Sequence, residues 1–225
     1  MAVRDGEVYT LGAARIDAVR ATERILEFDL SVELNHGIVV SNLAYAVASE
    51  MGLEESVCYE LAIAGMLHDI GKLKLTGYID GREQDPLLIE ELKYVRMHST
   101  LGYEELKGQG YSDFVLESIL YHHENYDGSG YPSNLAGEEI PLGARILRVC
   151  DVFAALSSDR PYRSAFDIHT VMELMIDEIK NFDMEIFLAF QRVIHNTRIA
   201  GGPNGVKEKT GNRYEGHFTK GDGNP

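Results

Sequence analysis

Apolar residues recur every three or four positions through most of this chain, which is the period of an α-helix that buries one face. Two consecutive stretches show the pattern: Leu34, Ile38, Leu43, Val47 and Met51, and then Val57, Leu61, Ala64 and Leu67. No stretch alternates convincingly with the period of two that a half-buried strand requires. The sequence therefore predicts an all-α protein.

Glycines and short polar residues mark where these helices begin and end. Gly52 is a suitable stop for the first helix, because glycine tolerates the backbone conformation that closes many helices. Ser112 is a good N-cap for a helix over 114–121, and Asp167 is a good N-cap for a helix over 168–180.

The length of the chain limits its architecture. A chain of 225 residues is long enough for one well-buried core and short for two domains. We therefore expect one helical domain over residues 28–199, preceded by an N-terminal segment, 1–27. Because seven glycines and few apolar residues follow position 200, we expect a disordered tail over 200–225.

Charge and hydropathy exclude several classes of partner. The formal net charge of −15 argues against a surface for long nucleic acid, which requires clustered cations. The chain has no apolar run near the 18 or so residues that span a membrane, and no signal-peptide pattern at its start. Cys58 and Cys150 lie in apolar helical patterns, as expected of two reduced thiols. We therefore expect a cytoplasmic protein.

Five of the eight histidines lie in contexts that favour metal binding over ordinary packing: His36, His68, His98, His122 and His123. The pair His68-Asp69 ends an apolar helical stretch, where two polar groups would be costly to bury unless something coordinates them. The other three are expected to be exposed or simply packed: His169, His195 and His217.

Adjacent pairs of metal-binding groups favour a dinuclear centre. Neighbouring residues on a helix point about 100° apart, so the members of a pair are better placed to serve two metals than one. Imidazole suits first-row transition metals, and a carboxylate such as Asp69 can bridge two of them. Asp151 interrupts an apolar helical pattern, which makes it an N-cap, an exposed residue or a further ligand.

The order and surroundings of these residues resemble the HD-GYP family of bacterial phosphodiesterases. Residues 68–72 are similar to the family's His-Asp-Ile-Gly-Lys signature, and residues 122–132 contain its His-His-Glu and Asp-Gly-x-Gly-Tyr-Pro elements. The stretches 146–156 and 160–163 also follow the family pattern, and the resemblance covers roughly residues 28–196.

The resemblance implies a helical HD domain with a metal site between its central helices. It implies seven metal ligands, with Asp69 as the bridge: His36, His68, Asp69, His98, His122, His123 and Asp151. It also implies that Lys72 contacts the phosphate, and that Arg160 and Arg163 hold the rest of a dinucleotide. Glu124 is expected to support a ligand rather than to act as one.

Two segments are predicted to form loops at this site. The motif loop that contains Asp127, Gly130, Tyr131 and Pro132 is tight and stiff. It would fix the histidine pair, offer a surface to a protein partner or serve as a plain turn. The segment Leu73–Asp85 departs from the family's pattern and is rich in glycine and polar residues from position 76, so we expect a loop there.

The sequence predicts two metal ions, iron or manganese, rather than three. Family members that hold a third metal carry a glutamate four residues before the first histidine ligand, where this chain has Val32. Glu33 lies three residues before His36, so on a regular helix its carboxylate is rotated by about 100° from the required direction. Nitrogen-rich ligation with a bridging carboxylate suits either iron or manganese.

The resemblance implies a metal-dependent phosphodiesterase that hydrolyses cyclic di-GMP, or a related cyclic dinucleotide, to the linear dinucleotide or the mononucleotide. The negative charge of a phosphodiester repels nucleophiles, so hydrolysis needs an activated water and a neutralised phosphate, and a two-metal site supplies both. Two alternatives remain open. One is an HD phosphohydrolase for another nucleotide, and the other is a catalytically silent module that binds a cyclic dinucleotide or a protein partner.

Overall fold

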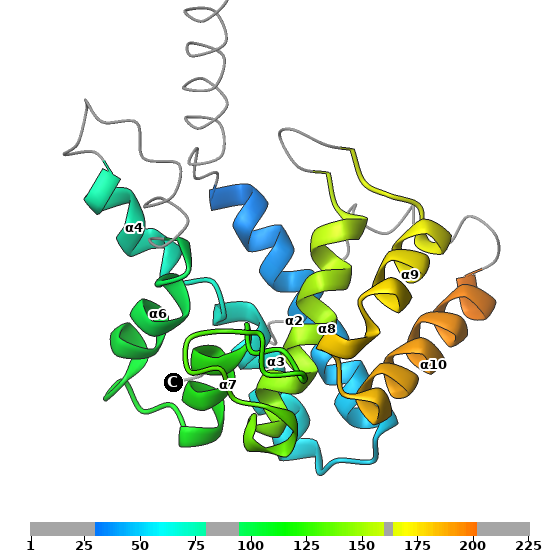
Figure 1. Ribbon diagram of the computed structural model, residues 1–225, viewed down its shortest axis with the longest axis horizontal. Helices are drawn as coiled ribbons and strands as arrows, with labels where there is room; N and C mark the ends of the chain where they lie inside the picture. The colour runs from blue at the N-terminus through cyan, green and yellow to red at the C-terminus, as the bar shows by residue number, and fades with distance from the viewer. Residues whose placement is uncertain (1–29, 80–94, 160–163, 202–225) are drawn as a thin grey trace, which may run out of the picture.

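The computed structural model describes residues 30–79, 95–159 and 164–201, and every regular element within these ranges is a helix. The predicted all-α class is confirmed. The helices, labelled as in Figure 1, are α2 (Leu30–Glu50), α3 (Glu55–Leu67), α4 (Lys72–Ile79), α6 (His98–Leu106), α7 (Asp113–Tyr121), η1 (Gly137–Glu139), α8 (Leu142–Ser157), α9 (Ile168–Asp177), η2 (Ile179–Asn181) and α10 (Met184–Gly201).

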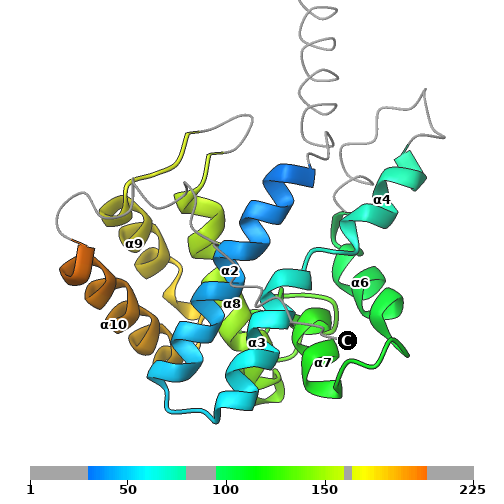
Figure 2. The ribbon, with the colours of Figure 1, turned by 180° about the vertical axis from the view of Figure 1, so that it is seen from behind.

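Helices α2, α3 and α8 form the centre of the bundle, with α4, α6 and α7 on one side and α9 and α10 on the other (Figure 1). The reverse view shows α2 and α3 side by side in front of α8 (Figure 2). Gly65 permits this close approach, because a Cβ at that position would lie 2.9 Å from the Cα of Ser41. The close packing brings one end of α3 against the middle of α2.

The core combines apolar side chains from α2, α3, α7, α8 and α10, among them Val40, Leu61 and Phe190. The periodic stretch that predicted α2 mixes two faces of that helix. Leu34 and Ile38 are 46% and 47% exposed, so the expectation that they belong to the buried face is wrong for these two residues. They lie on the other side of α2 from the buried residues, which begin at His36.

Two of the predicted caps are present. The hydroxyl of Ser112 accepts a hydrogen bond from the backbone N–H of Val115, and the carboxylate of Asp167 accepts from the first turn of α9. Gly52 has a φ of 74° directly after α2, as a helix stop requires. The predicted helix over 168–180 is too long, because Glu178 leaves the α-helical conformation and a 3₁₀ turn follows.

The prediction of a loop over Leu73–Asp85 is wrong in its first part, because α4 continues to Ile79. Leu75 is 7% exposed, so burial of apolar surface between α4 and α6 stabilises helix where Gly77 and the polar residues favoured a loop. The rest of that segment, the N-terminal segment 1–27 and the predicted tail beyond Gly201 lie outside the described residues.

Two further expectations concern membranes and thiols. Within the described ranges, no helix has the length and apolar character that crossing a bilayer requires. Cys58 and Cys150 are both buried and are not joined in a disulfide, as predicted.

Candidate metal centre

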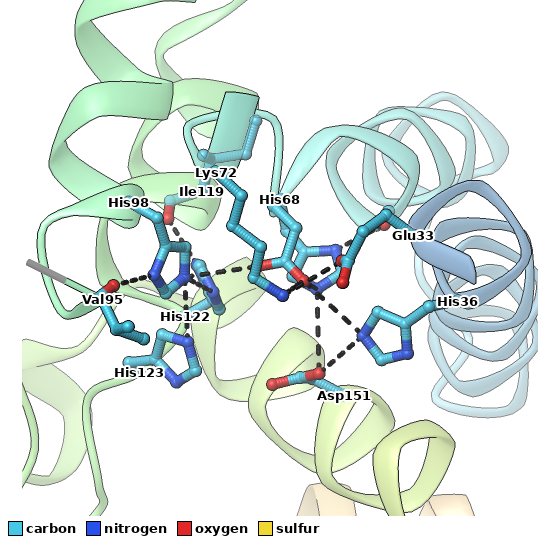
Figure 3. A network of polar contacts seen from close by, with 12 residues as sticks. Glu33, His36, His68, Lys72, Val95, His98, Ile119, His122, His123 and Asp151 are labelled. Carbon is cyan, nitrogen blue, oxygen red and sulfur yellow. Dashed lines mark hydrogen bonds and ion pairs between the residues drawn. The ribbon is translucent and has the colours of Figure 1, made fainter. Parts of the chain in front are cut away.

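The seven side chains predicted as metal ligands lie together at the meeting point of five helices (Figure 3). Helix α2 carries His36, the turn after α3 carries His68 and Asp69, α6 begins with His98, the turn after α7 carries His122 and His123, and α8 carries Asp151. Most of the imidazoles are almost fully buried. A polar cluster of this size inside an apolar core is costly unless its members have partners.

Asp69 connects the two halves of the cluster. Its Oδ1 lies 3.3 Å from the Nε2 of His98, and its Oδ2 lies 3.3 Å from the Nε2 of His68. The ligand atoms form two groups, each within 4.8 Å: Asp69 with His98, His122 and His123, and Asp69 with His36 and His68. The carboxylate that belongs to both groups is in the position of a bridge between two metal ions.

Three of the histidines are held in the same tautomer by the same kind of hydrogen bond. The Nδ1 atoms of His68, His98 and His122 each lie within hydrogen-bond distance of a backbone carbonyl three residues earlier. A carbonyl only accepts, so each Nδ1 carries the proton and donates it. The acceptors are the carbonyls of Gly65, Val95 and Ile119. In its neutral form each ring therefore presents an unprotonated Nε2 to the cluster, as a metal ligand must.

The unprotonated nitrogens fit a bound cation. The Nε2 atoms of His98 and His122 are 3.3 Å apart, and in this tautomer two lone pairs face one another. The Nε2 of His123 lies 3.1 Å from that of His98. The buried Nε2 of His68 has no hydrogen-bond partner. Buried lone pairs that converge without a donor require a positive ion between them.

Asp151 completes the half of the cluster around His36. Its Oδ1 lies 2.9 Å from the Nε2 of His36 and 3.7 Å from the Nε2 of His68. Asp151 lies within α8 and is 9% exposed, so it is neither an N-cap nor a surface residue. Of the three interpretations open from the sequence, the N-cap and the exposed residue are wrong, and the metal ligand stays a prediction. Burial would raise the pKa of Asp151, but the hydrogen bond from His36 and the positive charge of His68 hold it well below its usual value.

Histidines in the two halves of the cluster have pKa values shifted in different directions. Burial lowers the pKa of His98 and His122, and it lowers the pKa of His123 to about 3, so these rings are neutral at neutral pH. Burial also lowers the pKa of His68, but the carboxylates of Asp69 and Asp151 outweigh it and raise that pKa to about 10. Metal binding at His68 would therefore release a proton.

Helical geometry predicted that the adjacent histidines would serve two different metals, but their ligand atoms do not fall into different groups. His122 and His123 belong to the same group, and their ring centroids are 4.1 Å apart. Helix α7 ends at Tyr121, so the 100° rotation between neighbours does not apply to the turn that follows. The sequence pattern identified the residues and misjudged their directions.

Lys72 and Glu33 border the cluster on one side (Figure 3). The Nζ of Lys72 lies 2.6 Å from Asp69 Oδ2 and 3.0 Å from Glu33 Oε2. The helix does not persist from His68 to Lys72, because α3 ends at Leu67 and a turn separates it from α4. Lys72 reaches the cluster from the first residue of α4 instead.

Glu33 was predicted to have its carboxylate rotated by about 100° from the direction of a third metal ligand; it belongs to neither group of ligand atoms, but it reaches the edge of the cluster. The rotation of 100° describes the Cα–Cβ direction, whereas a glutamate has three further torsions with which to reach sideways. Lys72 comes to meet it from another helix. Burial would lower the pKa of Lys72, but the carboxylates of Asp69 and Glu33 raise it, so the ammonium stays charged.

The motif loop folds back onto one ligand. The ring of Tyr131 stacks on that of His123, with centroids 4.7 Å apart, and its backbone N–H donates to the carbonyl of His123 at 3.2 Å. A Cβ on Gly130 would collide with the backbone of residues 123–125, so glycine is required for this approach. Pro132 follows directly, and Asp127 accepts hydrogen bonds from Ser129 within the loop. This packing favours the interpretation that the loop orients the histidine pair.

Glu124 holds the same loop through a hydrogen bond. It is 1% exposed, and its Oε1 accepts a hydrogen bond from the backbone N–H of Ser133 at 2.6 Å. Its carboxylate is not among the groups that could hold a metal ion. These contacts agree with the supporting role expected from the sequence.

Some predicted residues lie elsewhere. Arg160, Arg163 and His217 fall outside the described residues, and His169 and His195 are exposed, as expected. Two arginines beside the motif loop, Arg96 and Arg148, were not predicted. Both are near a predicted ligand in the sequence, but only the folded chain brings Arg96 to Tyr131 and Arg148 to Asn125.

The chain was compared with known protein families. Residues 20–186 match the HD-domain family, which is well over half of the chain. The chain belongs to the HD-domain family. In this HD domain the family match includes all seven residues of the cluster.

Relatives of this HD domain support the HD-GYP resemblance. Cyclic di-GMP phosphodiesterase PA4108 of Pseudomonas aeruginosa is 36% identical over 163 residues, which cover 71% of this chain and 38% of that protein. The 3′3′-cGAMP-specific phosphodiesterase 1 of Vibrio cholerae is 35% identical over 156 residues, which cover 68% of this chain and 36% of that protein. The chain thus spans less than half the length of these relatives.

A solved structure shares the fold. Bd1817, an HDG"Y"P protein from Bdellovibrio bacteriovorus, matches with a TM-score of 0.57 at 20% identity, over 72% of this chain and 52% of that one. At this identity the match shows the shared helical fold, while the HD-domain match and the relatives support the recognition made from the motifs.

Proposed function

We propose that this HD domain is a metal-dependent phosphodiesterase that hydrolyses cyclic di-GMP, or a related cyclic dinucleotide, to the linear dinucleotide or the mononucleotide. The observation that carries the proposal is the position of Asp69, which belongs to both groups of ligand atoms. The named activities of the relatives in P. aeruginosa and V. cholerae support the substrate class.

The proposed ligands are the seven clustered residues: His36, His68, Asp69, His98, His122, His123 and Asp151. Two bound metal ions would supply an activated water and neutralise the phosphate under attack. The Nδ1 protons of His98 and His122 are committed to backbone carbonyls, so these neutral histidines bind and orient rather than exchange protons. Asp69 stays ionised because, although burial raises its pKa, the positive charges of His68 and Lys72 lower it further.

Lys72 is the proposed phosphate contact within the described residues. Its charged ammonium has three donors and already lies against Asp69, at the edge of the cluster. When Asp69 is engaged by metal, these donors can turn to a non-bridging phosphate oxygen. Arg160 and Arg163 are proposed to hold the rest of the dinucleotide, on the family resemblance alone.

We propose two metal ions, iron or manganese. The ligand set is rich in imidazole and has a shared carboxylate, which suits both metals. A third ion at Glu33 is not expected, because its Oε2 is engaged by the ammonium of Lys72. The two free buried thiols agree with a cytoplasmic location, and the motif loop keeps an exposed outer side on which a protein partner could dock.

The test is to incubate the purified, metal-loaded protein with cyclic di-GMP, cyclic GMP-AMP and cyclic di-AMP, and to separate the products by chromatography. We expect the linear dinucleotide or the mononucleotide from at least one of them, and no product after chelation. Hydrolysis of mononucleotide substrates alone would favour a different HD phosphohydrolase. Binding without turnover would favour a catalytically silent module.

A further inference from the structure

The arginines with described side chains fall into two pairs: two have a carboxylate partner, and two do not. Arg145 is paired with Asp183 at 2.6 Å, and Arg192 is paired with Glu50 at 2.6 Å. Among the described residues, Arg96 and Arg148 have no carboxylate partner. In a chain with a net charge of −15, a guanidinium without a carboxylate needs an explanation.

Both unpaired arginines lie beside Tyr131. The guanidinium carbon of Arg96 is 5.2 Å from the centre of the Tyr131 ring. Arg148 reaches the motif loop from α8: its Nε donates to the side chain of Asn125, and the backbone of Asn125 lies against Gly130, the residue before Tyr131. Because Tyr131 stacks on His123, the two cations border the metal cluster on the side of the motif loop.

Most of the hydrogen-bonding capacity of Arg148 is free within the described structure. Its Nε donates to the Oδ1 of Asn125 at 3.0 Å, and no other protein partner is found among the described residues. A guanidinium has five N–H donors in a planar fork, which matches the oxygens of a phosphate. Arg148 is also partly buried, so it has lost some water without gaining a counter-charge.

The proposed substrate class needs cations in this place. A cyclic dinucleotide has two phosphodiester groups, each with one negative charge, on opposite sides of its ring. Only one of them can lie at the metal cluster with Lys72 while it is cleaved. The other phosphate then leaves water at a different point and requires its own positive charge.

We propose that Arg96 and Arg148, beside Tyr131, bind the phosphate of the cyclic dinucleotide that is not being cleaved. This inference rests on the proposed function, since a substrate with a single phosphate would not use the site. It assigns to Tyr131 a positioning role: its ring packs against His123 and contacts Arg96, so it links the metal ligand to the second phosphate site.

The alternative is that Arg148 only holds the turn after α7 through Asn125, two residues beyond His123. Substitution by glutamine separates the two roles, because glutamine removes the charge and keeps a side-chain N–H donor. A holding role predicts that every substrate and the metal content suffer together. A phosphate-binding role predicts a loss that depends on whether the substrate has a second phosphate.

The experiment compares Arg96→Gln, Arg148→Gln and the double variant with the wild type and with Arg192→Gln. Arg192 is a matched control on α10, paired with Glu50 away from the cluster. For each protein, kcat/KM is measured for cyclic di-GMP and for bis(p-nitrophenyl) phosphate, which has one phosphate, and bound metal is measured by elemental analysis.

We expect each single variant to lower kcat/KM for cyclic di-GMP at least tenfold more than for bis(p-nitrophenyl) phosphate, as the loss of a charge-assisted hydrogen bond implies. The metal content and Arg192→Gln should match the wild type. Equal losses on both substrates, loss of metal, or no loss would overturn the second phosphate site. If the wild type cleaves bis(p-nitrophenyl) phosphate and no cyclic dinucleotide, the proposed function fails, and this site fails with it.

Discussion

The Nε2 atoms of His98 and His122 lie 3.3 Å apart, although each ring has committed its proton to a backbone carbonyl on its other side. Two buried lone pairs at this distance repel one another. The same backbone contacts that fix the rings therefore leave the folded protein incomplete without a cation. Metal binding and folding are coupled at this point of the structure.

Metal removal should consequently destabilise the fold. We expect the midpoint of thermal unfolding to fall by at least several degrees after chelation under reducing conditions, because ligand binding to the folded state alone adds to its stability. Addition of Mn²⁺ should restore the midpoint. Identical unfolding curves with and without chelator would show that the cluster does not need a metal ion.

Lys72→Ala should retain its metal and lose turnover. Lys72 touches Asp69 from outside the ligand groups, so its removal leaves the seven ligands in place. We expect kcat for cyclic di-GMP to drop about 100-fold or more, in the range found when a charged group that stabilises a transition state is removed. Lys74→Ala is the matched control, because Lys74 is 53% exposed on the same helix. Loss of metal from Lys72→Ala would make its assigned role wrong.

Two facing glycines should respond in opposite ways to alanine. A Cβ on Gly71 would collide with the carbonyl oxygen of His98, so Gly71→Ala should destabilise the fold by about 1–3 kcal/mol and displace a ligand. A Cβ on Gly102 would meet its nearest neighbour at 3.4 Å, and alanine should stabilise α6 by about 0.5–1 kcal/mol. Urea unfolding measures both. Equal effects of the two changes would contradict this packing.

Acid should destabilise the metal-free protein well above the pH at which carboxylates titrate. The pKa of His123 falls from 6.5 to about 3 on burial, so the unfolded chain takes up a proton as the pH falls below 6.5 and the folded chain does not. Stability is therefore lost on acidification, by about 2 kcal/mol for one such histidine between pH 7 and pH 5.

His98 and His122 act in the same direction as His123, whereas His68 opposes them, because its raised pKa gives stability that is fully present below pH 6.5. The stability that the three histidines lose on acidification is greater than the stability that His68 gains. The measurement is urea unfolding of the chelated protein at pH 7 and pH 5, with His123→Gln expected to show a smaller loss. Equal or greater stability at pH 5 would rule out neutral burial of these rings.

The sequence predicted the helices and the membership of the cluster, because both leave local signals. Apolar periodicity marks a helix, and His68-Asp69 at the end of an apolar stretch marks a cost that only a partner can offset. Both signals come from residues close together in the chain. Neither depends on how the helices are placed in space.

The features that the sequence did not predict depend on contacts between distant segments. Glu33 reaches the site only because Lys72 approaches from α4, and Leu34 is exposed because α3 and α8 pack on the other face of α2. Arg96 contacts Tyr131, and Arg148 contacts Asn125, only when the motif loop folds back. Directions of side chains beyond a helix end cannot be deduced from a helical period.

The measurement that tests the account most directly is the number of metal ions per chain in the wild type and in Asp69→Ala. Asp69 is the one residue shared by both groups of ligand atoms, so its loss removes a ligand from each. Glu33→Gln is the matched control, because Glu33 borders the cluster without belonging to either group.

Elemental analysis of protein purified without oxygen should find two iron or manganese ions per chain in the wild type and in Glu33→Gln, and fewer than one in Asp69→Ala, with hydrolysis of cyclic di-GMP lost in parallel. Unchanged metal content and full activity in Asp69→Ala would contradict the bridged centre.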